Sequence, residues 1–476
     1  MANVWNYLAN EGDYPDLDAD SACKHLSAAI QCRTITYLDS SLMEWKEFDL
    51  LHMLMREAYP HVFSHAEVKE IDHSLLIRIP GSDPSLRPIM LMGHQDVVPV
   101  VAGSEKNWTH PPFSGYIDDT YIWGRGAIDM KDQTIGILEA AEYILAHEQK
   151  LERSLILSFG QDEEGIQSGA SRIADLLAHC NTKLEFLIDE GDYRITDGSL
   201  YGANGEPLRM VHLAEKGYCD LQLVSHSAGG HSSNPFHGTS LAILSEAIHR
   251  ITQDHHEPKL IPLVRLSFET IADCINAEPL HTFVSNIDAH SAEIAQLCAK
   301  DANLFPLVVT TTAPTMIEGS SAQPNVMPQN MRAVINFRIL PGETCAGILA
   351  HVQDLLKSLP VEVQILPNSA NNPSQISRYD SYGVRCLQAV SSRYFVNPKT
   401  KKGLRVVPAL ATGASDARMY EKICDSCLRY SAFVVDDEED EHGVHGINER
   451  VTRRAYLQGI RFMIRLIQSS CMHVQK

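Results

Sequence analysis

Histidine and acidic residues follow three short apolar runs of the sequence. The runs and the residues after them are 88–92 with His94 and Asp96, 155–159 with Glu163 and Glu164, and 184–188 with Asp189. Apolar runs of this length are typical of buried strands, and open α/β sheets bind ligands beyond the carboxyl ends of their strands. Mixed imidazole and carboxylate ligands suit zinc. The pattern therefore predicts a metal site at one edge of a sheet.

Two loops supply further candidate ligands. Asp129 follows two glycines in the segment 123–131 (WGRGAIDMK), just before a predicted helix, and His445 lies in 442–446 (HGVHG). Each residue alone has an ordinary explanation, since Asp129 could cap the helix and His445 could be a surface histidine. Together with the first three clusters, they favour two ions about 3.5 to 4 Å apart that share a bridging carboxylate.

Strands and helices alternate in the first part of the chain, as such a sheet edge requires. Between the runs 88–92 and 155–159, the apolar residues of 137–144 recur at helical spacing and share one helix face. The order strand, helix, strand predicts an α/β sheet with crossover connections. A Rossmann-type dehydrogenase does not fit, because Gly124 and Gly126 belong to no G-x-G-x-x-G motif after a strand.

A region of different pattern begins near residue 215. It combines strand-like runs with amphipathic helices, and the segment 367–374, rich in Asn, Pro and Ser, is typical of a linker. The chain then ends in another amphipathic helix. We therefore predict a discontinuous catalytic domain in residues 1–214 and 368–476, interrupted by a smaller α+β lid or dimerisation domain at 215–367.

The composition excludes several classes of partner. The formal net charge of -20, with no basic stripe, argues against nucleic acid. The sequence contains no run of about 18 apolar residues, so we expect no membrane span. The first residues lack the pattern of a signal peptide. Eleven scattered cysteines indicate reduced thiols and a cytoplasmic location. The C-x-x-C formed by Cys424 and Cys427 has no second pair nearby, so we interpret it as two ordinary cysteines.

As a set, the motifs resemble those of the aminoacylase/carboxypeptidase S family of zinc metallopeptidases. The motifs are GHQDVVPV, WGRGAIDMKD, DEEG and HGINER, with GGHSS at 229–233 and NVMP at 325–328 resembling the family's smaller domain. The resemblance runs from about residue 90 to the last helix and is greatest to carboxypeptidase S and its relatives. It implies a catalytic domain of the zinc exopeptidase type, with a mixed sheet flanked by helices.

The resemblance also implies a role for each polar residue. Two zinc ions would bind per chain, with manganese or cobalt as possible substitutes. Asp96 would orient His94 through a hydrogen bond, and the peptide bond between Asp129 and Met130 would be cis. The implied roles are His94 and Asp189 on the first zinc, Glu164 and His445 on the second, Asp129 as the bridge, and Glu163 as the general base.

Substrate contacts are implied from two further places. Arg418, in the segment 412–418, would bind the substrate carboxylate, for which its planar fork is suited. Ala414 and Ser415 depart from the family's usual Gly-Thr in this segment. His231 would donate to the oxyanion or to the substrate carboxylate with help from Asn325, either by domain closure or across a homodimer.

These residues predict a hydrolase that cleaves an amide or peptide bond next to a free carboxylate. A metallo-carboxypeptidase or dipeptidase acting on small peptides is the first interpretation. An N-acyl amino acid hydrolase is the alternative, because its substrates present the same amide and carboxylate. A non-catalytic peptide-binding relative fits less well, because every implied ligand and the base are present.

Overall fold

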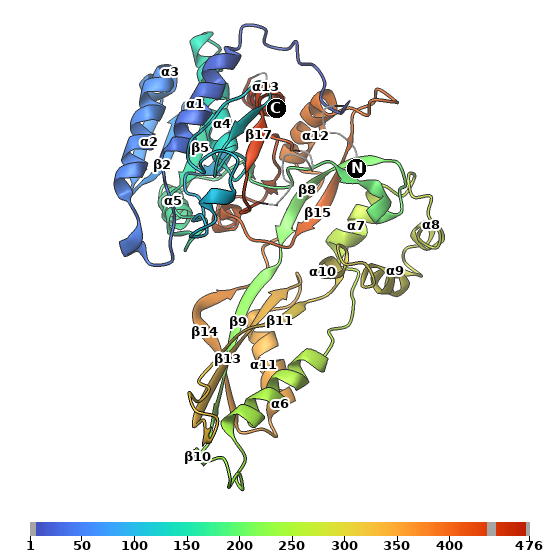
Figure 1. The fold of residues 1–476 in the computed structure, drawn as a ribbon. Coiled ribbons are helices and arrows are strands. Elements are labelled where there is room, and N and C mark those ends of the chain that lie inside the picture. Colours follow the sequence, from blue (N-terminus) through green and yellow to red (C-terminus); the bar gives the residue numbers. More distant parts are fainter. Residues whose placement is uncertain (1–5, 436–443, 473–476) are drawn as a thin grey trace.

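The computed structural model describes residues 6–435 and 444–472, and its ribbon divides visibly into two parts (Figure 1). A large sheet covered by helices occupies one end. A smaller sheet with two helices projects from it. No helix in the described ranges is long and apolar enough to cross a membrane.

The main sheet has nine strands, and its centre carries the strand ends that the sequence predicts to hold ligands. β3 (Ile89–His94) lies between β5 (Leu155–Gly160) and β6 (Leu187–Asp189) and is parallel to both, so the three carboxyl ends share one edge. Antiparallel pairs β1–β2, β2–β5 and β16–β8 make the sheet mixed. The full order is β1 (Glu67–Ile71), β2 (Ser74–Ile79), β5, β3, β6, β16 (Cys427–Arg429), β8 (Pro207–Glu215) and β15 (Arg405–Ala411), with β7 (Thr196–Asp197) paired to β8.

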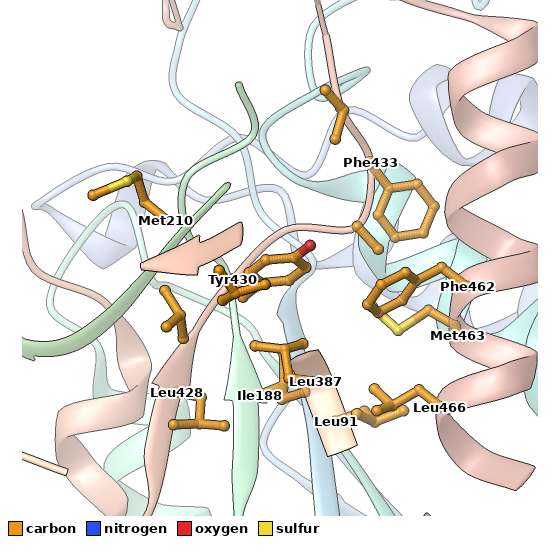
Figure 2. Close-up of a cluster of buried hydrophobic side chains, with 14 of the residues drawn as sticks. Leu91, Ile188, Met210, Leu387, Leu428, Tyr430, Phe433, Phe462, Met463 and Leu466 are labelled. Atoms are coloured by element: carbon orange, nitrogen blue, oxygen red, sulfur yellow. The ribbon is translucent and has the colours of Figure 1, made fainter. Parts of the chain in front are cut away.

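Helices cover both faces of the main sheet, because its strands are apolar on both sides. Leu91 packs into a core with the helices of one face, while Met90 and Met92 pack with those of the other, as the two-residue period of a strand requires. Figure 2 shows Leu91 and Ile188 against Phe462 and Leu466 of the last helix. The first face carries α1 (Ala19–Gln31), α4 (Lys131–Ala146), α12 (Tyr382–Tyr394) and α13 (Arg453–Cys471), and the second carries α5 (Ser168–His179) and the short helix η5 (Asp416–Tyr420). The predicted mixed α/β sheet flanked by helices is confirmed.

The smaller sheet has four antiparallel strands and a hydrophobic core of its own. Two helices pack on one face of this sheet, and their apolar residues complete that core. We call this part the projecting unit; β10 lies at its far end (Figure 1). It comprises β11 (Thr311–Glu318), β13 (Asn330–Ile339), β9 (Gly217–His226) and β14 (Val361–Asn371) in that order, with α6 (Ser240–Gln253), α11 (Cys345–Leu356), and the pair β10 (Gly230–His231) and β12 (Val326–Met327).

Two features of residues 215–367 differ from the sequence interpretation. Residues 261–309 pack into the core of the main sheet rather than into that of the projecting unit. The expected linker 367–374 is partly strand, because β14 continues to Asn371. The helices of residues 261–309 are α7 (Pro262–Thr270), α8 (Leu280–Ser285), α9 (Ser291–Cys298) and α10 (Phe305–Val308). The domain boundaries themselves stay a prediction.

Candidate metal centre

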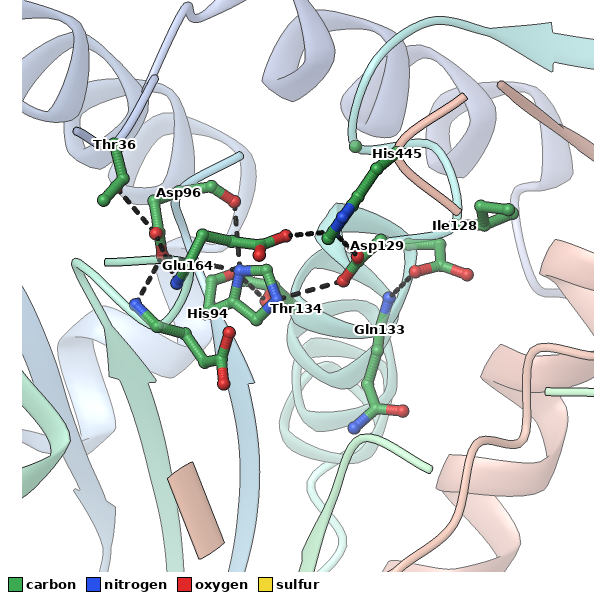
Figure 3. A network of polar contacts seen from close by, with 12 residues as sticks. Thr36, His94, Asp96, Ile128, Asp129, Gln133, Thr134, Glu164 and His445 are labelled. Carbon is green, nitrogen blue, oxygen red and sulfur yellow. Dashed lines mark hydrogen bonds and ion pairs between the residues drawn. The ribbon is translucent and has the colours of Figure 1, made fainter. Parts of the chain in front are cut away.

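The candidate site lies where the central strands of the main sheet end. His94 is the last residue of β3, and the loop after β5 carries Glu163 and Glu164. Asp129 stands before α4, and His445 comes from a loop near the C-terminus. Figure 3 shows that the side chains of His94, Asp129, Glu164 and His445, from segments far apart in the sequence, converge on one place.

Asp129 presents its two carboxylate oxygens to two different histidines. Oδ1 lies 3.2 Å from Nε2 of His94, and Oδ2 lies 3.0 Å from Nε2 of His445. Nε2 of His445 also lies 2.9 Å from Oε1 of Glu164. Ligand atoms of Asp129, Glu164 and His445 all lie within 4.8 Å of one another, and so do those of His94, Asp129 and Glu190. The geometry thus defines two ligand groups that share Asp129.

Glu190, and not the expected Asp189, completes the group of His94 and Asp129. The Asp189 carboxylate is turned away and accepts a hydrogen bond of 2.7 Å from the backbone N–H of Ala417 in η5. Successive side chains of an extended segment point to opposite sides, so only one of these adjacent acids can face the site. Asp189 directly follows the apolar run 184–188, but that position does not decide which of the two adjacent acids faces the site.

Asp96 ties the first two strand ends together. Nδ1 of His94 lies 3.0 Å from the backbone oxygen of Asp96 and 3.4 Å from its carboxylate Oδ1. The same carboxylate accepts hydrogen bonds from the backbone N–H groups of Glu163 and Glu164, at 3.1 and 3.0 Å, and one of 2.6 Å from the Thr36 hydroxyl. Fully buried, Asp96 thereby fixes both the histidine and the acidic loop in position.

A buried ion pair that the sequence analysis missed joins the Asp129 loop to the His445 loop. Nη1 of Arg125 donates to Glu449 over 2.6 Å, and its Nη2 donates to the backbone oxygen of His445 over 2.9 Å. Oε1 of Glu449 accepts from the backbone N–H groups of Gly126 and Ile128. Both charged residues belong to the motifs WGRG and INER, which was the available signal.

The backbone around Asp129 adopts conformations that the local sequence permits. Gly124 and Gly126 have φ values of 145° and 89°, which residues other than glycine rarely adopt. The peptide bond between Asp129 and Met130 is cis, as predicted. Asp129 is therefore held at the end of a tight turn.

The donor set fits divalent cations on electrostatic grounds. Burial acts to raise the pKa of Asp129, but hydrogen bonds with His445 and His94 outweigh it and hold that pKa below its ordinary value. Burial raises the pKa of Glu163 to about 8, and with repulsion from Glu163 it raises the pKa of Glu190 well above its ordinary range. Four neighbouring carboxylates are costly without a balancing positive charge, and two histidines beside them make zinc-type ions suitable.

A cavity of about 490 Å³ opens beside Glu190. Its walls mix aromatic and aliphatic side chains with a buried polar group in which Glu215 accepts hydrogen bonds from Ser415 and Arg429. Burial lowers the pKa of His212, which also lines the cavity. The apolar part includes Tyr193, Leu200, Tyr201, Met210 and Leu307. The cavity is large enough for a substrate side chain or an acyl group.

The remaining expected substrate residues belong to neither ligand group. His231 is exposed in β10, beside Asn325, whose backbone oxygen accepts from Ser232 over 2.9 Å. Because β10 lies at the far end of the projecting unit, the structure brings these two residues together but not to the metal ligands (Figure 1). Arg418 lies in η5 and donates to the backbone oxygen of Asn372, at the junction of the two sheets.

A mixed sheet with two histidines and four acids at one edge is the arrangement of a metal-dependent hydrolase. Residues 90–469 match the family described as Peptidase family M20/M25/M40, and the chain belongs to this family of metallohydrolases. The resemblance seen in the sequence is thus confirmed.

Similar proteins include both peptidases and N-acyl amino acid enzymes. The chain is 31% identical to the probable carboxypeptidase S-like 2 of Dictyostelium discoideum, over 94% of this chain and 84% of that protein. It is 32% identical to the N-fatty-acyl-amino acid synthase/hydrolase PM20D1 of Mus musculus, over 94% and 87%. The M20 family metallo-carboxypeptidase Sso-CP2 from Sulfolobus solfataricus shares the fold, with a TM-score of 0.65, 16% identity, and coverage of 94% and 98%. Human carnosine dipeptidase 1 does so with a TM-score of 0.64, 15% identity, and coverage of 96% and 97%.

Proposed function

We propose that the chain hydrolyses an amide or peptide bond next to a free carboxylate, as a carboxypeptidase or dipeptidase does, with two zinc ions at the Asp129 centre. The observation that carries this proposal is the division of the Asp129 carboxylate between His94 and His445. His94 and Glu190 would hold one ion, Glu164 and His445 the other, and Asp129 both. Manganese or cobalt could replace zinc at such ligands.

When bound, such ions acidify a water molecule and polarise the substrate carbonyl. Glu163 would take the proton of the attacking water and deliver it to the leaving amine. Its position supports this role, since it lies in the loop after β5, next to the ligand Glu164, and its Oε1 accepts a hydrogen bond of 2.7 Å from Gln167.

Arg418 would bind the substrate carboxylate, and His231 with Asn325 would complete the site from a second copy of the chain. The place of β10 at the far end of the projecting unit favours a homodimer over action within one chain. Closure of the projecting unit onto its own main sheet is the alternative. A donor aimed at the developing oxyanion would account for the role of His231.

An N-acyl amino acid hydrolase is the second candidate, because the cavity beside Glu190 has a wall of Tyr193, Leu200, Met210 and Leu307 that suits an apolar acyl group. The eleven cysteines, all unpaired, support a reducing compartment such as the cytoplasm. Neither peptide nor acyl amino acid substrates require a nucleic acid or membrane partner.

A panel of substrates, each compared with a form whose carboxylate is blocked, tests the proposal. Purified enzyme would be offered dipeptides, longer peptides and N-acyl amino acids, each also as its C-terminal amide. We expect cleavage of the free acids only, with the faster class deciding between the two candidates. Equal cleavage of acids and amides would refute the requirement for a carboxylate.

A further inference from the structure

A second cluster of side chains that could hold a metal ion lies next to Gln95, the residue after the ligand His94. Ligand atoms of Asp49, Glu70 and His73 all lie within 4.8 Å of one another. Nδ1 of a fourth residue, His52, lies 3.6 Å from Oε1 of Glu70. Asp49 and His52 are three residues apart in α2 (Trp45–Ala58), so they share a helix face. Glu70 is in β1, and His73 is in the turn that follows it.

Hydrogen bonds place a proton on Nε2 of His52. Nε2 of Gln95 donates to the backbone oxygens of His73 and Phe159, at 2.9 and 3.0 Å, so its Oε1 must face His52. His52 therefore donates from Nε2 to this oxygen over 2.6 Å. In the neutral ring with its proton on Nε2, Nδ1 carries a lone pair, which is the form that binds metals.

Two ring nitrogens of the cluster have no hydrogen-bond partner within the described part of the chain. Nδ1 of His52 is one of them, on a side chain that is only 5% exposed. The other is Nδ1 of His73, which lies 3.2 Å from the Asp49 carboxylate without hydrogen-bond geometry. A lone pair of His52 that faces the Glu70 carboxylate is repelled by it, unless a cation lies between them.

Two separations within the cluster are close to those of a coordination sphere. Zinc lies about 2.0 to 2.1 Å from nitrogen and oxygen ligands in a tetrahedron, which separates the ligand atoms by about 3.3 Å. The two histidine–carboxylate separations are 3.2 and 3.6 Å. His73 is held in place, because its ring stacks on Trp45 with centroids 4.6 Å apart. Arg56 approaches Glu70 from the other carboxylate oxygen, at 3.8 Å, and leaves Oε1 to the cluster.

We propose that Asp49, His52, Glu70 and His73 form a further binding site for a divalent ion of the zinc class. The ion would connect α2 to the turn after β1. Through His52 and Gln95 it would also brace the strand end that carries His94 and Asp96. The site lies before residue 90, outside the segment that matches the family, and it is separate from the catalytic proposal.

Bound zinc per chain tests this site. Asp49→Asn combined with Glu70→Gln removes both charges while keeping the side-chain size, and both positions are exposed, so the fold should survive. Glu57→Gln, an exposed acid on the same helix, is the matched control. After dialysis against a zinc buffer, elemental analysis should find one ion fewer per chain in the double variant than in the wild type and the control. Added zinc should also raise the thermal midpoint less in the double variant.

The same pair of substitutions in an Asp129→Ala background separates this site from the catalytic centre. We expect one zinc to remain in Asp129→Ala and to be lost when Asp49 and Glu70 are also changed. His73→Gln provides a second variant, which should lose the same ion. Equal zinc content in the wild type, the double variant and the control, all folded by circular dichroism, would overturn the proposal whatever the catalytic centre binds.

Discussion

The Asp129 centre and the tip of the projecting unit differ in how firmly their residues are held. At the centre, Asp96, Arg125 and Glu449 are buried and connect the ligand loops through hydrogen bonds. At the tip, His231 is exposed, and its Nδ1 accepts from the nearby backbone N–H of Ser233 over 3.1 Å. A site held this firmly is prepared for its ligands in advance, whereas an exposed tip needs a partner surface to position it.

Removing the shared ligand at the centre should have the largest effect on zinc content and turnover. Asp129→Ala deprives both ligand groups of an oxygen, so we expect loss of the catalytic zinc and of detectable turnover. Elemental analysis and kinetics on the same folded sample measure both. A variant that keeps its full zinc content would show that Asp129 is not a bridge.

Glu163→Gln should separate metal binding from proton transfer. The amide is close in size but cannot accept a proton, so kcat should fall by about 100- to 10,000-fold. Zinc content should equal that of the wild type. Substantial remaining turnover would remove Glu163 from the role of base.

His231→Ala tests the tip. Loss of an oxyanion donor should lower kcat by about 100- to 1,000-fold without loss of zinc. His237→Ala changes another exposed histidine, in the loop that follows β10; it is the control and should keep normal activity. A normal rate for His231→Ala would exclude the tip from catalysis.

Mixed dimers then show which chain the histidine serves. Co-expression of His231→Ala with Glu163→Gln, each with its own tag, yields hybrids in which one centre can combine an intact Glu163 with the partner's histidine. Recovered activity in the purified hybrid is expected if His231 acts across the interface. Failure of every hybrid, with both single variants inactive, would point to closure within one chain.

The smallest effect is expected at the junction of the two regions. Lys216 precedes β9, and its Nζ donates to the backbone oxygens of Pro306 and Val309 at 2.8 Å. Burial lowers its pKa from 10.5 to about 7. At pH values between these two pKa values, Lys216 is protonated in the unfolded chain but neutral in the folded chain. Its contribution to the free energy of unfolding should therefore rise with pH.

Lys216→Met should remove that contribution. The test compares urea midpoints at about pH 7 and pH 9 for the wild type, Lys216→Met and the exposed-lysine control Lys300→Met. We expect the midpoint of Lys216→Met to rise less, or fall more, over this interval than the other two. An identical pH dependence in all three would contradict a neutral Lys216 in the folded state.

Much of the fold and of the site follows from local sequence patterns. The apolar runs at 88–92 and 155–159 correspond to β3 and β5, and the acids after them converge as expected. A short continuous apolar run is enough to predict each of these strands, because each strand is buried on both faces.

The rest depends on contacts between distant segments. Whether Asp189 or Glu190 faces the site is set by Ala417, which lies 228 residues beyond Asp189. Arg125 and Glu449 pair across 324 residues. Helical periodicity in 261–309 shows that the helices are amphipathic, but not which of two cores they cover.

The central claim is that Asp129 joins two ions, with Glu190 rather than Asp189 on the first. A crystal structure of the zinc-loaded enzyme, with anomalous data collected at the zinc edge, tests it most directly. We predict two peaks flanking the Asp129 carboxylate, one within bonding distance of His94 and Glu190 and the other of Glu164 and His445. A single peak there, or a first ion bound by Asp189, would contradict the account.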